Sequence, residues 1–140
     1  MTVTATPRPT GHPGYAQTLD RLPESAGVAR SLVRTALAAW HQDEMTEDAL
    51  NIITELVSNA VDHARSPSIR VIVTRPADGR IRLGVVDRSR KLPEMRTDSI
   101  GDQVRGRGLV LVEALSDRWG TDLHRRGKTV WAEIQCEPAQ

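Results

Sequence analysis

The chain has 140 residues, of which 39% are hydrophobic and 3% aromatic, with no phenylalanine and a formal net charge of +1. This length predicts one domain, whose core must be built from leucine, valine, isoleucine and alanine. The near-neutral charge gives no reason to expect nucleic acid or an anionic membrane as a partner.

The ends of the chain and its cysteine content give further limits. Cys136 is the only cysteine, which excludes an intrachain disulfide and a cysteine zinc site. Residues 1–14 lack the apolar segment of a signal peptide, and no apolar run could span a bilayer, so we expect a cytoplasmic protein without a membrane partner. Because 1–14 is rich in Thr and Pro, it is predicted to be a flexible tail, followed by a single domain over 15–136.

After a short edge strand over 15–22, two amphipathic helices are predicted. The first should begin at Ser25, a candidate N-cap, and continue to about Trp40, since apolar residues recur there at helical spacing. The second should open at Thr46, another candidate N-cap, and end near Ala64, before a Ser-Pro pair that disfavours helix.

The pattern then changes to the alternation that is typical of strands. Apolar residues alternate over 69–74 and over 81–85, with a Pro-Ala-Asp-Gly turn between them, which predicts a hairpin. A second hairpin is predicted near the C-terminus, from strands over 118–123 and 128–135.

Between the two hairpins, 88–105 has no convincing period and is predicted to be an unusually long loop, followed by a short apolar helix over 109–115. The strands come as adjacent pairs and do not alternate with crossover helices, which argues against a parallel doubly wound sheet. The predicted fold class is therefore α/β: a two-layer α/β sandwich with helices on one face of a mixed, mostly antiparallel sheet.

The second helix carries a polar stripe that could bind a metal ion. Glu55, Asn59 and Asp62 stand at positions i, i+4 and i+7, so their side chains line up along one side of the helix. A carboxylate one turn from a carboxamide supplies oxygen ligands of the kind that Mg²⁺ prefers when it also holds phosphates. The alternative is the solvated face of an ordinary amphipathic helix.

Three later positions could contact a nucleotide. Gly106-Arg107-Gly108 before a helix can bind an anion through free backbone N–H groups, although it could equally be a tight turn. Asp87 could accept a hydrogen bond from an adenine amino group or only cap a turn. The Thr129 hydroxyl could reach the same base, or the residue could serve only the strand.

The whole series of motifs resembles the GHKL ATPases, named for gyrase, the heat-shock chaperone, histidine kinases and MutL. It is most similar to the small stand-alone ATP-binding proteins related to the anti-sigma-factor serine kinases of actinobacteria. The resemblance runs from Pro23 to Glu133 and implies a Bergerat-type ATP-binding fold.

The segment from Glu55 to Ala60 resembles the N box. This implies that Asn59 is the Mg²⁺ ligand, that Glu55 is the catalytic base, and that Asp62 and His63 flank the nucleotide.

The remaining motifs complete the implied nucleotide site. Val85-Val86-Asp87 resembles the G1 box, with Asp87 reading the adenine, and the last box places Thr129 near that base. The G2 box, which would close over the phosphates, comprises Gly106, Arg107, Gly108 and Leu109. The chain departs from the family in the G1 box, where Arg88-Ser89-Arg90 follows Asp87 in place of the usual Asp-x-Gly-x-Gly.

By resemblance the protein is an ATP- and Mg²⁺-binding regulator of the anti-sigma-factor kinase type. It would phosphorylate a serine or threonine of a small antagonist protein, bind a sigma factor, and form a homodimer. A second hypothesis is a regulatory module whose partner binding is gated by nucleotide, without kinase turnover. A third is a structural domain in which the face that carries Glu55 and Asn59 is merely solvated.

Overall fold

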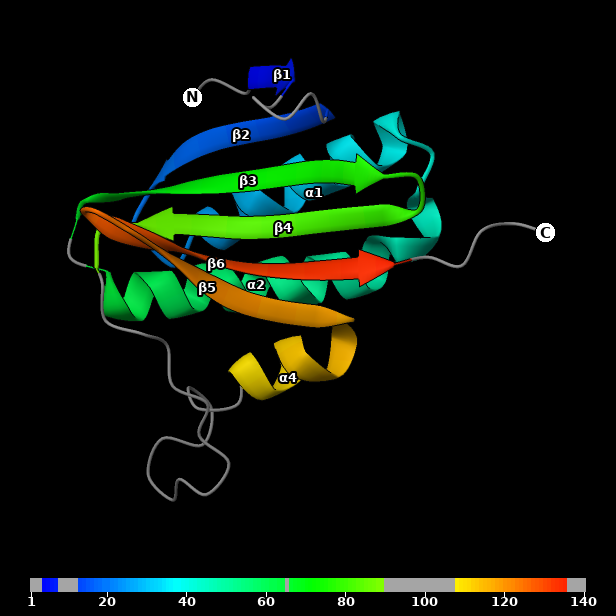
Figure 1. Ribbon diagram of the computed structural model, residues 1–140. Helices are drawn as coiled ribbons and strands as arrows, with labels where there is room; N and C mark the ends of the chain where they lie inside the picture. Colours follow the sequence, from blue (N-terminus) through cyan, green and yellow to red (C-terminus); the bar gives the residue numbers. More distant parts are fainter. Residues whose placement is uncertain (1–3, 8–12, 65, 90–107, 136–140) are drawn as a thin grey trace.

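The computed structural model describes residues 4–7, 13–64, 66–89 and 108–135. The elements in chain order are β1 (Thr4–Pro7), β2 (Pro13–Asp20), α1 (Ser25–Ala39), the 3-10 helix η1 (Asp43–Met45), α2 (Thr46–His63), β3 (Ser68–Ala77), β4 (Arg80–Asp87), α4 (Gly108–Leu115), β5 (Arg118–His124) and β6 (Gly127–Gln135). The strands form one sheet in the order β1-β2-β3-β4-β6-β5 (Figure 1).

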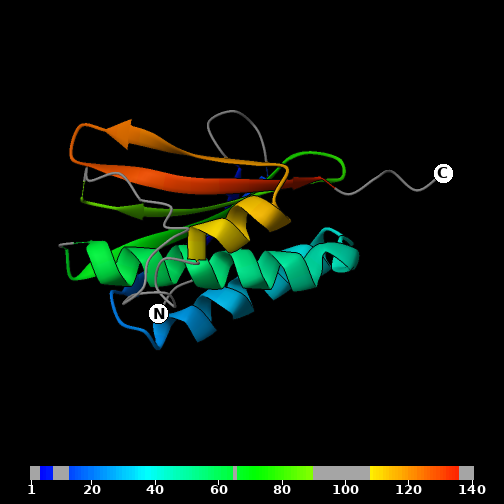
Figure 2. The ribbon, with the colours of Figure 1, turned by 90° about the horizontal axis from the view of Figure 1, so that it is seen from below.

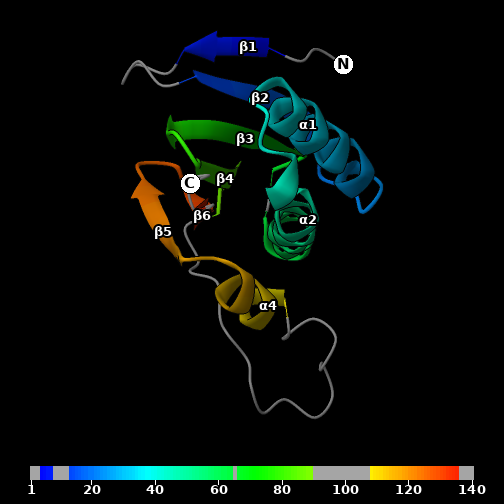
Figure 3. The same ribbon diagram turned by 90° about the vertical axis from the view of Figure 1, so that its right-hand side faces the viewer.

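The molecule has two layers, with α1, α2 and α4 all on one face of the sheet (Figure 3). This arrangement confirms the predicted two-layer α/β sandwich. Every pairing among the described strands is antiparallel, so the mixed character that the sequence predicts does not occur in this part of the chain. No helix among the described residues is long and apolar enough to cross a membrane.

The core lies between the sheet and the helices. Successive strand residues point to opposite faces, so alternate residues of β4 and β6 meet the apolar side of α2, and alternate residues of β3 meet α1. The largest fully buried apolar side chains come from β2, α1, α2, β3 and β4: Leu19, Leu37, Ile52, Ile53, Leu56, Ile69, Ile81 and Leu83. This packing fixes α2 under the centre of the sheet and so determines which flanks of that helix stay open.

Both helices begin where the sequence predicts, but neither candidate N-cap acts as one. Ser25 is the first residue of α1 and not its N-cap, because its hydroxyl donates to the Asp20 carbonyl oxygen, at 2.7 Å, and holds the helix against the end of β2. Thr46 is likewise the first residue of α2, after Met45 in the N-cap position, and no side chain caps that start. Backbone bonds from the preceding turns set both starts.

The tail prediction for 1–14 is wrong where the structure describes it. Thr4–Pro7 pairs with the start of β2, and β2 itself begins at Pro13 and pairs with β3 on its other side. β2 is therefore not the edge strand that the sequence predicts over 15–22. Strand addition requires only backbone hydrogen bonds, so a segment poor in apolar side chains can still join a sheet edge.

Candidate functional site

Helix α2 has two different flanks, and the predicted polar stripe lies on one of them. α1 and α4 both contact α2 and lie on opposite sides of it (Figure 3). The flank toward α1 carries Thr54, whose hydroxyl oxygen accepts a hydrogen bond from Arg30 at 3.4 Å. With 3.6 residues per turn, Glu55 and Asn59 then fall on the flank toward α4. Both side chains are half-buried.

The environment of Glu55 matches a proton-accepting role. Desolvation by burial raises the pKa of its carboxyl group above the ordinary value. A carboxylate is a better general base when its pKa lies closer to the working pH. Asn59, one turn further along the same flank, adds a carboxamide oxygen.

The C-terminal end of α2 is held by an arginine from outside the helix. Arg21 donates to the carbonyl oxygen of Val61, at 3.0 Å, and to that of Ser66, at 2.8 Å. A cation at this position complements the negative end of the helix dipole. Asp62 and His63, which the resemblance places beside the nucleotide, are both exposed on this last turn.

Helix α4 supplies the other side of the candidate site. It begins at Gly108, is anchored by the buried Leu109, and packs against α2. Its first turn lies beside the C-terminal half of α2, so the two predicted halves of the site are on the same side of the molecule (Figures 1 and 2). Gly106 and Arg107, the rest of the predicted G2 box, lie outside the described residues.

Asp87 ends β4 at the same side of the molecule as the C-terminus of α2 (Figure 1). Its carboxylate faces the helical layer, as do Leu83 and Val85 earlier in the strand. Its oxygen Oδ1 accepts from the Ser89 backbone N–H at 2.7 Å and from Lys128 Nζ at 3.1 Å. The Lys128 ammonium also donates to the Ser89 carbonyl oxygen at 2.8 Å.

This ion pair is fully enclosed, since each side chain has a relative exposure of 1%. Sequence reasoning missed Lys128 and singled out Thr129 instead. Thr129 pairs with Val86 and lies on the opposite face of the sheet, where its hydroxyl is 2.6 Å from His124 Nε2. The structure therefore does not bring Thr129 to Asp87. Counting back in steps of two from the buried Val130 would have placed Lys128 on the inner face.

The donor set suits Mg²⁺ held jointly with phosphates. Among the described residues no group of three or more His, Cys, Asp or Glu side chains could hold a metal by itself. Glu55 and Asn59 offer hard oxygen donors on one flank, and Mg²⁺ usually takes few protein ligands and completes its shell with water and phosphate oxygens. The residues thus fit a metal that arrives with a nucleotide.

Fold and site together define a two-layer α/β domain with a polar helix flank, a neighbouring helix start and a buried aspartate at one end. Residues 44–138 match the family profile of the histidine kinase-, DNA gyrase B- and HSP90-like ATPases. The chain belongs to this family, and family membership implies ATP binding. The resemblance noted from the sequence is confirmed.

The chain is also similar to two individual proteins. It is 32% identical over 89 residues to an uncharacterized protein of Streptomyces coelicolor, SCO4941, a match that covers 62% of this chain and 81% of that protein. It is also similar to the crystal structure of the RsbU and RsbW domains of Rv1364c from Mycobacterium tuberculosis, at 25% identity and a TM-score of 0.64. That likeness covers 88% of this chain but only 32% of the solved one, so the chain spans less than half of that protein.

Proposed function

We propose that this protein is a Mg-ATP-dependent regulatory serine/threonine kinase that phosphorylates a small antagonist protein. The observation that carries the proposal is the flank of α2 with Glu55 and Asn59 beside the start of α4. Family membership supplies the nucleotide, and the likeness to a protein with an RsbW domain supports the anti-sigma-factor branch. The cytoplasmic location expected from the sequence is part of the same proposal.

In the proposed reaction a serine or threonine hydroxyl of the antagonist attacks the γ-phosphorus of ATP. The new P–O bond forms as the bond to the β,γ-bridging oxygen breaks, so the products are a phosphoprotein and ADP. Glu55 accepts the hydroxyl proton, and its raised pKa suits this role. Backbone N–H groups at the start of α4 would lie near the phosphates and stabilise the charge that develops there.

A Mg²⁺ ion held together with the nucleotide would supply charge neutralisation at the phosphates. Asn59 would hold the metal through its carboxamide oxygen. Asp62 and His63, exposed at the end of the same helix, would lie at the border of the nucleotide. A sigma factor as the second partner, and a homodimer as the working state, are further parts of the proposal.

Substitutions at Glu55 and Asn59 test these roles separately. Asn59→Ala should abolish Mg-dependent nucleotide binding in titration calorimetry, whereas Glu55→Ala should spare binding and remove transfer of labelled phosphate to a co-encoded antagonist. Glu47→Ala, at an exposed position in the first turn of the same helix, serves as the control for both measurements. Equal nucleotide affinity for Asn59→Ala and the wild type would contradict the metal role.

The second candidate is a module that binds nucleotide and gates a partner without transferring phosphate. The altered G1 box favours it, because Arg88-Ser89-Arg90 follows Asp87 where the family has glycines. Wild-type protein that binds Mg-ATP but labels no candidate antagonist would support this module over the kinase. A titration that shows no binding up to millimolar nucleotide would remove both and leave a purely structural domain.

A further inference from the structure

We infer that Lys128 is a positioning residue, which orients the Asp87 carboxylate so that one of its two oxygens stays available to the base of a bound nucleotide. The inference rests on the proposed function and on the expectation that Asp87 accepts a hydrogen bond from adenine. Its basis is the set of hydrogen bonds between the end of β4 and the start of β6.

The orientation of an aspartate carboxylate depends on its hydrogen bonds. The torsion that rotates the carboxylate is broad and roughly two-fold, so it does not select which oxygen faces the protein. Around Asp87 two donors make that selection, because the Ser89 backbone N–H at 2.7 Å and the Lys128 ammonium at 3.1 Å both bind Oδ1. These two bonds fix the carboxylate with Oδ1 toward the protein.

Lys128 can serve as a fixed donor because its own position is determined twice. It pairs directly with Asp87 in the ladder between β4 and β6, and its ammonium also donates to the Ser89 carbonyl oxygen at 2.8 Å. The preceding Gly127 permits this close approach, since a Cβ atom there would lie 2.0 Å from the Asp87 carbonyl oxygen. Lys128 thus holds both ends of residues 87–89, where the chain departs from the family's G1 box.

The second carboxylate oxygen of Asp87, Oδ2, is the acceptor that remains. It has no partner among the described residues, whereas every fully buried side-chain nitrogen or oxygen among them has one. Oδ2 is therefore the atom through which the side chain keeps its slight exposure, 1% in relative terms. A base could bind there without displacing Lys128, and hydrogen bonds to carboxylates are among the stronger ones in proteins.

The test compares Mg-ATP with Mg-tripolyphosphate, which lacks the adenosine, by titration calorimetry on the full chain. The wild type should bind Mg-ATP at least about tenfold more tightly, the effect of one hydrogen bond to a charged group. Lys128→Met removes the ammonium at similar side-chain length, and a buried carboxylate without its partner rotates or takes up a proton. The ratio of the two affinities should then fall at least about fivefold, with the affinity for Mg-tripolyphosphate unchanged.

A purely structural role would lower the free energy of unfolding but leave this ratio unchanged in protein that circular dichroism shows to be folded. Arg82→Gln is the matched control, because it removes a positive charge from the opposite face of β4 and should not change the ratio. If Lys128→Met does not fold, Lys128→Gln carries the comparison, since its amide still donates to the carboxylate. With this neutral donor the ratio should fall about threefold.

The possible failures of the inference and of the proposed function are distinguishable. An unchanged or increased ratio in the folded Lys128 variant overturns the inference and leaves the proposed function intact. A wild type that binds Mg-ATP and Mg-tripolyphosphate equally does the same. Absence of binding by both ligands overturns the inference and the proposed function together.

Discussion

Two groups of paired charges lie on opposite faces of the same strands, β4 and β6. On the inner face, Asp87 and Lys128 are enclosed, at a relative side-chain exposure of 1% each. On the outer face, Glu133 is also buried, at 5%, but its partners Arg82 and Arg118 are 34% and 62% exposed. The inner pair lacks contact with water on either side, whereas the outer group has it through both arginines.

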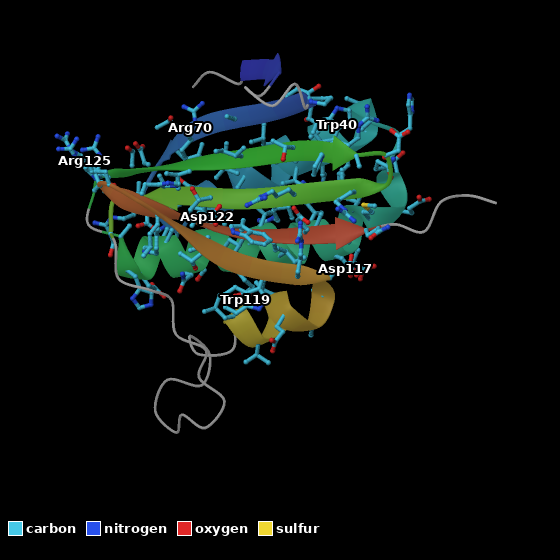
Figure 4. All side chains as sticks on the ribbon, in the orientation of Figure 1. Trp40, Arg70, Asp117, Trp119, Asp122 and Arg125 are labelled. Carbon is cyan, nitrogen blue, oxygen red and sulfur yellow. The ribbon has the colours of Figure 1, made fainter. Side chains whose placement is uncertain are left out.

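The outer group also has further side-chain partners. Arg82 lies 4.2 Å from the centre of the Trp131 ring and 3.2 Å from an Asp122 carboxylate oxygen. Asp122 in turn accepts from the indole N–H of Trp131 at 3.3 Å. Asp122 lies on the open face of the sheet, away from the helices (Figure 4).

The comparison shows that the same pairing of charges has different consequences on the two faces. A charge that loses its partner on the outer face is solvated or finds another partner, so it costs little. A charge that loses its partner on the inner face stays buried and uncompensated, which is strongly destabilising. The two members of the inner pair therefore depend on each other more than the members of the outer group do.

Lys128→Ala should have the largest effect. It leaves the Asp87 carboxylate buried without its ammonium partner, and we expect a loss of about 3–5 kcal/mol in the free energy of unfolding. Urea denaturation followed by circular dichroism measures it. The double variant Asp87→Ala/Lys128→Ala should recover part of the loss, since no lone charge remains. A single variant as stable as the wild type would show that the pair is not enclosed.

Gly127→Ala should come next. A Cβ atom there would lie 2.0 Å from the Asp87 carbonyl oxygen, so β6 would have to move away from β4, at a cost of about 1–3 kcal/mol. Gly120→Ala is the matched control, because its Cβ would meet only the Trp131 side chain, at 3.0 Å, on the open face. Thermal melts should show the larger drop for Gly127→Ala, and equal drops would contradict the close approach of Gly127 to the end of β4.

Arg82→Gln should have a small effect. It removes the ion pairs with Asp122 and Glu133, and an exposed pair contributes about 0.2–1 kcal/mol. The difference from the wild type should shrink further in molar salt, because screening weakens exposed pairs. Unfolding curves at low and high salt measure this. A loss above about 2 kcal/mol in the free energy of unfolding would show that removing a partner on the outer face costs as much as on the inner face.

Glu55→Gln should have the smallest effect on stability, and its sign depends on pH. Because the folded pKa of Glu55 is raised, the folded state binds this proton more readily than the unfolded state. The favourable contribution is present below the ordinary pKa and is lost as the pH rises through the folded value. Glu55→Gln should therefore be slightly more stable than the wild type at pH 7, within about 0.5 kcal/mol, but not at pH 4. Urea midpoints at both pH values test it, and the opposite order would contradict the raised pKa.

Most of the fold could be predicted from local patterns in the sequence. The helical spacing of apolar residues before Ala64 and the alternation in both hairpins each depend on one segment at a time, and all of these elements were found. The helix starts at Ser25 and Thr46 were found, but neither residue is the N-cap that the sequence predicts, because caps depend on where the neighbouring chain lies. β1 has no apolar pattern, so only its pairing with β2 reveals it.

The site was predicted less completely. Glu55 and Asn59 follow from helical spacing within α2, and Asp87 follows from its place at the end of an apolar strand. The position opposite Asp87 depends on the register between β4 and β6, which lie about 40 residues apart in the chain, as the separation of 41 between Asp87 and Lys128 shows. A difference of one residue in that register exchanges the two faces of the strand, so the sequence did not reveal that Lys128, and not Thr129, faces Asp87.

The sequence by itself determined the elements, the layers and the polar flank of α2, because these depend on periods of 3.6 and 2 residues that any segment carries alone. Only the tertiary structure decided that Asp87 shares its carboxylate with Lys128 and that α4 begins beside the C-terminal half of α2. Those facts depend on which segments meet in space, and the packing of one common core fixes that for all of them at once.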